Sequence, residues 1–348
     1  MARVYLDWNA TAPLRPEARA AMVAAMDVLG NPSSVHGEGR QAKALIERAR
    51  AQVAQAFGAD GADIVFTSGA TEAAALACAE RGLQGAGIEH DAVRAWISET
   101  LPVDKTGAVT VTEPAGSVLQ YANSETGLLQ TLPDGLAVCD ATQAFGKVPL
   151  AFNWLGAQMA LISAHKLGGP KGIGALVLKR GTDVGARILG GGQEMGRRSG
   201  TENVIGIAGF GAAAEAAARD LDAGEWTKVS GIRNILEIAI ETEAKTTIFV
   251  GKGESRLPNT SCLIAPGWKG ETQVMVMDLA GYAVSAGSAC SSGKVRASQV
   301  LTAMGFDADM ASSAIRVSIG PETTEDMVLR FAETWCRAYN KHRARGGT

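Results

Sequence analysis

The chain has 348 residues, of which 46% are hydrophobic and 20% are charged, and its formal net charge is −3. This composition excludes a disordered chain and argues against a protein that coats nucleic acid, which needs a basic face. The length accommodates two domains of ordinary size.

No membrane or export signal is evident. No apolar run approaches the ~18 residues that span a bilayer, and the N-terminal residues lack the basic and apolar regions of a signal peptide. The cysteines are odd in number, widely spread and without a C-x-x-C pair: Cys78, Cys139, Cys262, Cys290 and Cys336. We therefore expect a reduced, cytoplasmic chain with no disulfide framework, no metal site and no membrane association.

In chain order, two alanine-rich amphipathic helices come first, predicted over residues 15–30 and 39–58. Pro16 fits a first-turn position, and Gly30 and Gly58 fit helix ends. Short apolar runs then alternate with turns and helices between residues 62 and 181. These runs do not alternate strictly with polar residues, which favours strands buried on both faces of a mostly parallel sheet.

A helix-rich stretch follows from residue 198, and further apolar runs lead to a last helix predicted over 324–339. This pattern predicts a smaller α+β unit after a larger α/β unit. We place the boundary near residues 222–226. The expected division is a large domain of residues 14–222 and a small domain made of 1–13 and 223–348.

The segment TSGATE, residues 67–72, follows an apolar run and opens a helix. The backbone N–H groups of Gly69, Ala70 and Thr71 would face an anion there, although an ordinary helix cap is the alternative. No G-x-x-x-x-G-K-[ST] loop occurs, and GFGAAA at 209–214 is interpreted as a close-packed helix. A phosphate site here need not hold a nucleotide.

Three further segments carry polar groups beside apolar runs. Asp140, with Gln143 three residues later, ends one run, where α/β proteins build sites; a helix cap is the alternative. Lys166 follows another run, where partial burial would make its amine nucleophilic; an exposed loop lysine is the alternative. Cys290 lies among small residues, which favours an accessible thiol over a structural one.

These pieces together meet the needs of pyridoxal 5'-phosphate. That cofactor requires a lysine for the Schiff base, a carboxylate on the pyridine nitrogen and a helix-terminus cup for the phosphate. An aromatic or histidine ring over the pyridine is also common. Lys166, Asp140, the Gly69–Thr71 turn and His90 supply these four elements.

In these and neighbouring segments the chain resembles the NifS/IscS-like cysteine desulfurases of the class V aminotransferase family. The matching segments run in family order from residue 5 to about residue 320: YLDWNATAP, GNPSSVHGEGRQA, VFTSGATE, IEHDAV, NSETG, DATQAFGKVPL, SAHKLGGPKGIGAL, GGGQEMGRRSGTENV, GSACSSG and AIRVSIG. The resemblance implies fold type I of the pyridoxal phosphate enzymes, with a sheet of the seven-stranded type in the large domain.

The resemblance also assigns roles to residues. Lys166 would form the Schiff base and move the Cα proton, Asp140 would pair with the pyridine nitrogen, and His90 would stack on the ring. Gln143 would bind the ring-hydroxyl side. The cofactor contacts implied around them are Ala70, Thr71, Asn123, Ser124, Ser163, His165 and, from a partner subunit, Thr201.

For the substrate, the resemblance implies that Arg316 and Asn9 bind L-cysteine. Cys290 would attack the substrate sulfur, which releases alanine and leaves a persulfide for a sulfur acceptor, such as an iron–sulfur scaffold or a thiolation protein. A homodimer is expected, with no nucleic acid partner. By contrast, Lys171 is interpreted as a loop residue between strands.

The chain departs from the family pattern at two places. Ser124 stands where many relatives have asparagine, and the stretch 72–123 is shorter, with a poor strand before His90. Two alternatives stay open at this point: a related class V lyase or aminotransferase acting on another amino acid, such as selenocysteine, and a non-catalytic scaffold.

Overall fold

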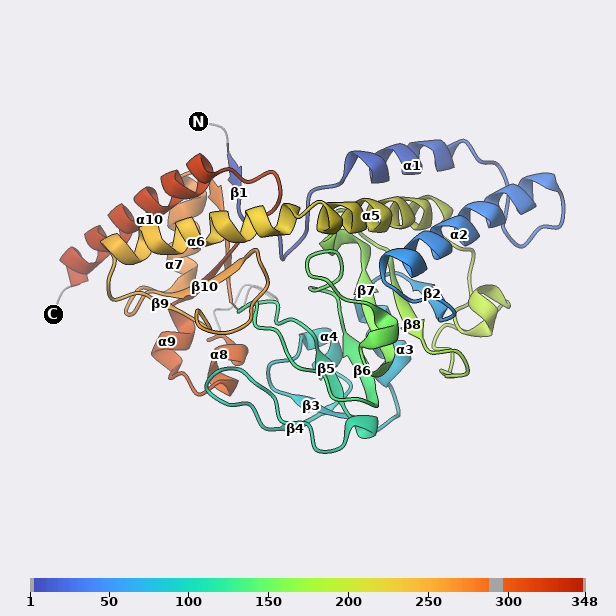
Figure 1. Ribbon diagram of the computed structural model, residues 1–348, viewed down its shortest axis with the longest axis horizontal. Helices are drawn as coiled ribbons and strands as arrows, with labels where there is room; N and C mark the ends of the chain where they lie inside the picture. The colour runs from blue at the N-terminus through green and yellow to red at the C-terminus, as the bar shows by residue number, and fades with distance from the viewer. Residues whose placement is uncertain (1–2, 288–296, 347–348) are drawn as a thin grey trace.

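A computed structural model describes residues 3–287 and 297–346 (Figure 1). Cys290, the predicted nucleophile, lies outside the described residues. The centre of the molecule is a five-stranded sheet whose strands, in spatial order, are β2 (Asp63–Thr67), β8 (Gly174–Leu178), β7 (Ala157–Ser163), β6 (Leu136–Asp140) and β5 (Val118–Gln120). Strands β5, β6 and β7 are parallel, and β8 is antiparallel to both β7 and β2.

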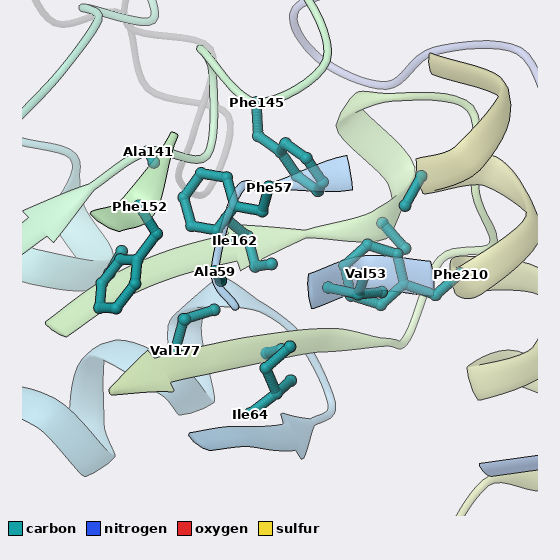
Figure 2. Packing of buried hydrophobic residues seen from close by; sticks show 14 of the residues in the cluster. Val53, Phe57, Ala59, Ile64, Ala141, Phe145, Phe152, Ile162, Val177 and Phe210 are labelled. Carbon is teal, nitrogen blue, oxygen red and sulfur yellow. The ribbon is translucent and has the colours of Figure 1, made fainter. Parts of the chain in front are cut away.

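Alternate side chains of these strands enter two different cores. In β8, Ala175 and Val177 belong to one buried cluster, and Leu176 and Leu178 belong to another. The sheet is therefore buried on both faces, as the apolar runs predicted. Figure 2 shows the first cluster, in which aromatic rings such as Phe57 pack among the strands.

Helices cover both faces of this sheet (Figure 1). Helices α1 (Pro16–Met26) and α2 (Gly37–Ala56) pack against α5 (Val204–Asp222), and α3 (Ala70–Cys78) packs on β7 and β8 together with the short α4 (Asp91–Arg94). The first helix begins at Pro16, one residue after the predicted start, so Pro16 stands in the first turn as predicted. It ends at Met26, four residues before Gly30. The second begins two residues earlier than predicted, with the His36 side chain as its cap.

Two more strands, β3 (Gln84–Ala86) and β4 (Ser98–Leu101), form a separate parallel pair. A single bridge from Gln84 to Ser117, the residue before β5, links this pair to the central sheet. The α/β fold with mostly parallel strands is confirmed, but its seven strands are split into five and two. The cause is local: β3 has only three residues, and its register shifts between Gly85 and Ala86.

The C-terminal part contains a four-stranded antiparallel sheet in the order β12 (Ser285–Ala286), β13 (Ala314–Ser318), β10 (Thr260–Ile264) and β9 (Ile248–Phe249). Its helices are α6 (Glu225–Glu243), α7 (Gly270–Leu279), α8 (Gln299–Ala303), α9 (Ala308–Ser312) and α10 (Glu325–Gly346). The N-terminal strand β1 (Val4–Tyr5) pairs with β11 (Tyr282–Ala283) in this part.

Helices α5 and α6 follow one another across the top of Figure 1, and the predicted boundary at 222–226 falls where they meet. The division into two domains stays a prediction. Short 3₁₀ segments complete the chain: Pro114–Gly116, Phe152–Trp154, Ala164–Lys166 and Gln193–Gly196. None of the helices in the described part of the chain is long and apolar enough to cross a membrane.

Candidate active site

A cavity of about 1170 Å³ lies where β6 and β7 end, since the last residues of these strands, Asp140 and Ser163, both line it. Neighbouring parallel strands end at the same edge of a sheet, and this is where α/β proteins bind ligands. Most of the predicted site residues meet in its wall: Asn9, Ala70, Thr71, His90, Ser124, Asp140, Gln143, Ser163, His165, Lys166 and Arg316.

One end of the cavity is suited to an anion. The first residues of α3, Ala70 and Thr71, line the cavity together with Gly69, so N–H groups and the positive end of a nine-residue helix face it. The backbone of Gly69 lies directly against β8: a Cβ on Gly174 would stand 2.8 Å from the Gly69 Cα atom. Only glycine at position 174 allows the helix to start this close to the sheet.

His165 lines the same cavity from the turn that follows β7. Burial, together with the charges of Lys166, Lys171 and Lys147, lowers the pKa of His165 to about 4. The ring is therefore neutral at pH 7. Its Nδ1 atom is buried without a hydrogen-bond partner among the described residues. A neutral ring with an unused polar atom can serve a polar ligand.

Asp140 is buried at the end of β6, and its Oδ1 atom accepts a hydrogen bond of 2.9 Å from the backbone N–H of Thr142. Asp140 therefore caps the turn that follows β6, which was the alternative interpretation, and it also lines the cavity. The Thr142 hydroxyl beside it is buried and has no partner within the described residues. A cationic ring nitrogen is a suitable partner for such a carboxylate.

The Lys166 amine lies across from the N-terminal segment. Its Nζ atom donates to the backbone carbonyl of Asn9 at 2.7 Å and to that of Ala10 at 3.0 Å. The side chain is partly buried in the cavity wall. Lys166 is therefore not an exposed loop lysine. Two backbone carbonyls hold its amine at the cavity wall.

Arg316 comes from β13 and is held by two acceptors. Its guanidinium donates to Asp7 Oδ1 at 2.8 Å and to the backbone carbonyl of Ser124 at 2.9 Å. The Asn9 side chain donates to the same Ser124 carbonyl at 3.3 Å and to the Thr260 hydroxyl at 2.8 Å. These bonds fix the direction in which Arg316 presents its charge to the cavity.

His90 is exposed and lines the cavity at the start of α4, which it caps: its Nδ1 atom accepts the backbone N–H of Ala92 at 3.1 Å. This bond leaves the ring face and the Nε2 atom for other contacts. Stacking of His90 on a cofactor ring stays a prediction, and the anchored ring gives it a fixed position.

Two predicted contacts lie elsewhere. Asn123 is buried beneath the wall, where its Oδ1 atom accepts bonds from the backbone N–H groups of Glu125 and Thr126 and from the Thr126 hydroxyl. This side chain holds a turn instead of facing the cavity. Thr201 is exposed and does not line the cavity of its own chain. Its contribution to a partner's site stays a prediction.

The sequence analysis gave no role to several charged residues of the wall, among them Glu125 and Glu89. Burial raises the pKa of Glu125 to about 7, and the Ser298 hydroxyl donates to this carboxyl. Burial and nearby Asp140 raise the pKa of Glu89 well above its usual range. Lys171 lies in the turn between β7 and β8, as interpreted, and it also lines the cavity. The motif IEHDAV could have pointed to Glu89, because this residue directly precedes His90.

The chain belongs to the aminotransferase class-V family, whose model matches residues 4–93 and 118–331. A cysteine desulfurase of Cereibacter sphaeroides is 38% identical over 96% of this chain and 95% of its own length. A NifS-like protein of Rickettsia africae superposes with a TM-score of 0.86 at 30% identity, covering 97% of this chain and 99% of that one. SspA, solved in complex with cysteine, gives a TM-score of 0.73 at 25% identity over 92% of this chain and all of that one.

Proposed function

We propose that this chain is a cysteine desulfurase that depends on pyridoxal 5'-phosphate. It converts L-cysteine into L-alanine and leaves the sulfur atom as a persulfide on Cys290. The observation that carries the proposal is that Lys166, Asp140 and the start of α3 all face one cavity. Each was interpreted from a separate motif, and the fold brings them together.

The residues of the cavity fit this cofactor. The start of α3, with Thr71, Ser163 and His165, would hold the phosphate. The Nδ1 atom of His165 would supply a polar contact, since no residue of the described part of the chain bonds to it. Asp140 would hold the pyridine nitrogen in its protonated form, and Gln143 would face the ring hydroxyl. When bound, pyridoxal phosphate supplies an aldehyde that reacts with amines and a ring that withdraws electrons from the α-carbon of an amino acid.

The chain's own groups would carry out the remaining steps. Arg316, directed by Asp7, binds the carboxylate of L-cysteine. Lys166 takes the proton from the Cα atom of the substrate and returns it. Cys290 attacks the substrate sulfur as a thiolate, so that one S–S bond forms while the Cβ–S bond breaks and alanine leaves. Atoms balance, because cysteine and a thiol give alanine and a persulfide.

The direct test is to incubate the pyridoxal phosphate-loaded protein with L-cysteine and to measure alanine and protein-bound persulfide. The wild type should form both, and Cys290→Ala should keep the visible absorption of the cofactor but form no persulfide. Undiminished sulfur release by Cys290→Ala would overturn the assignment. Turnover of selenocysteine without turnover of cysteine would instead support the related lyase.

We further propose a cytoplasmic homodimer that passes sulfur to an acceptor protein, for instance an iron–sulfur scaffold. The expected contribution of Thr201 to a partner's phosphate site supports the dimer, because this residue is exposed and lies outside the cavity of its own chain. Thr201→Ala protein mixed with a Lys166→Ala protein tests this directly. Activity recovered in mixed dimers would show that Thr201 acts across subunits.

A further inference from the structure

Lys147 is a buried lysine that the proposed reaction does not use. Its side chain is 1% exposed, and it lies behind the cavity wall instead of in it. It follows Gln143 by four residues in a helical turn, where the N–H of Phe145 bonds to the Ala141 carbonyl. This spacing puts Gln143 and Lys147 on the same side of the turn.

The Lys147 amine has two acceptors. Its Nζ atom donates to Gln143 Oε1 at 2.7 Å and to Asn9 Oδ1 at 3.2 Å. Among the ion pairs of the described residues, none includes Lys147. An ammonium has three N–H groups to satisfy, whereas a neutral amine has two, which matches the two acceptors.

The charges around the amine agree with a neutral form. Burial, with the positive charges of Lys166 and Arg316, lowers the pKa of Lys147 well below its usual range. Burial of an ammonium without a carboxylate partner is unfavourable enough that the group loses its proton instead. Lys147 is therefore a hydrogen-bond donor to two amide oxygens, without a carboxylate partner among the described residues.

The contacts continue from Lys147 toward the cavity. With its Oε1 atom facing Lys147, Gln143 turns its Nε2 atom to the Asn9 carbonyl at 3.0 Å. The Lys166 amine donates to this same carbonyl at 2.7 Å. If the Gln143 amide were reversed, its oxygen would face the Asn9 carbonyl oxygen, and two acceptors would repel each other.

Asn9 is fixed in the same way. Its Oδ1 atom accepts from Lys147 and, at 3.0 Å, from the side chain of Asn259, and its own amide donates to Thr260. The residue is fully buried. One buried amine thus contacts both Gln143, which lines the cavity, and Asn9, whose backbone carbonyl accepts from Lys166.

We propose that Lys147 is a positioning residue: from behind the cavity wall, its amine orients Gln143 and Asn9 and, through them, the cavity-facing amide donor and the Lys166 amine. The proposal rests on the proposed function and adds a residue to it that does not touch substrate or cofactor. A lysine that only filled space in the core would be replaced by methionine with no effect on Gln143.

A double-mutant cycle separates these two roles. Lys147→Met removes both donors at similar length, Gln143→Leu removes the amide, and a third protein carries both changes. The expected result is that Lys147→Met and Gln143→Leu each lower kcat for L-cysteine by about tenfold or more, and that the double variant stays within about threefold of Gln143→Leu. The visible absorption maximum of the loaded double variant should coincide with that of Gln143→Leu.

Two further variants serve as controls. Lys147→Gln keeps an N–H donor group on a shorter side chain and should retain more activity than Lys147→Met. It replaces Lys147→Met in the cycle if that protein does not fold. Met277→Ala removes a long side chain that is buried in the C-terminal core and should leave the absorption spectrum unchanged. Effects of Lys147→Met and Gln143→Leu that multiply, or a wild-type spectrum in Lys147→Met, would overturn the proposal.

The cycle is repeated on the cofactor-free protein with the equilibrium constant for unfolding as the readout. Coupling of about fivefold or more between positions 147 and 143 is expected, and independent effects would contradict the proposal. If the wild-type protein forms no persulfide, the proposed function fails, and the unfolding cycle still decides whether Lys147 orients Gln143.

Discussion

The His165 ring gives a prediction about pH that needs neither cofactor nor substrate. Its pKa in the folded protein is about 4, whereas the usual pKa of histidine is 6.5. Between these values the unfolded chain binds a proton that the folded chain does not bind. The free energy of unfolding contributed by His165 is therefore fully present above pH 6.5 and is lost as the pH falls toward 4.

The magnitude follows from the difference between the usual pKa of 6.5 and the pKa of about 4 in the folded protein. Each unit corresponds to about 1.4 kcal/mol, and the part of the transition between pH 6.5 and pH 4.5 gives about 2 kcal/mol. The ring is partly exposed, and water screens the charges of the neighbouring lysines, so we halve this figure to about 1 kcal/mol. The His165→Gln protein has no titrating group at this position and therefore lacks this pH-dependent contribution to the free energy of unfolding.

The assay is urea unfolding of the cofactor-free wild-type and His165→Gln proteins at pH 6.5, 5.5 and 4.5. The wild type should lose about 1 kcal/mol more than the variant over this range. Pyridoxal phosphate should remove the difference, because a phosphate beside His165 favours the protonated ring. Equal losses in the two cofactor-free proteins would refute the assigned environment of this ring.

Three other predictions concern buried charges. Glu237→Gln leaves its buried arginine partner uncompensated and should lower the free energy of unfolding by about 3–5 kcal/mol in urea titrations. Asp140→Asn keeps the shape of the site but loses its charge, so kcat for L-cysteine should fall by about a hundredfold or more in an alanine-release assay. Stability of the wild type relative to Lys147→Met should rise between pH 7 and 9, by at most about 1.4 kcal/mol per pH unit, since the unfolded chain binds the extra proton.

The sequence predicted the strands of the central sheet well. These strands are buried on both faces, so each is a continuous apolar run that can be recognised from the local sequence alone. It also predicted that Asp140 and Lys166 would face one site, since each follows a buried run. The sequence did not predict that two strands would separate from the central sheet. Strand β3 contains Gly85 and has only three residues, so no strong local pattern marks it.

Long-range contacts account for what the sequence did not show. The orientation of Asn123 depends on the Ile88 carbonyl, 35 residues away, to which its side chain donates, and its motif alone gave it a cofactor contact. The burial of Lys147 depends on Asn9, which is 138 residues away. Lys171 lies in the turn between β7 and β8, as interpreted, but its place in a cavity wall depends on segments that are distant in the sequence.

The most direct test of the central claim is a single-turnover reaction of the pyridoxal phosphate-loaded protein with L-cysteine in the absence of reductant. One alanine and one persulfide per active site should form in the wild type, and the persulfide should map to Cys290. Alanine without persulfide, or persulfide that persists in Cys290→Ala, would contradict the account.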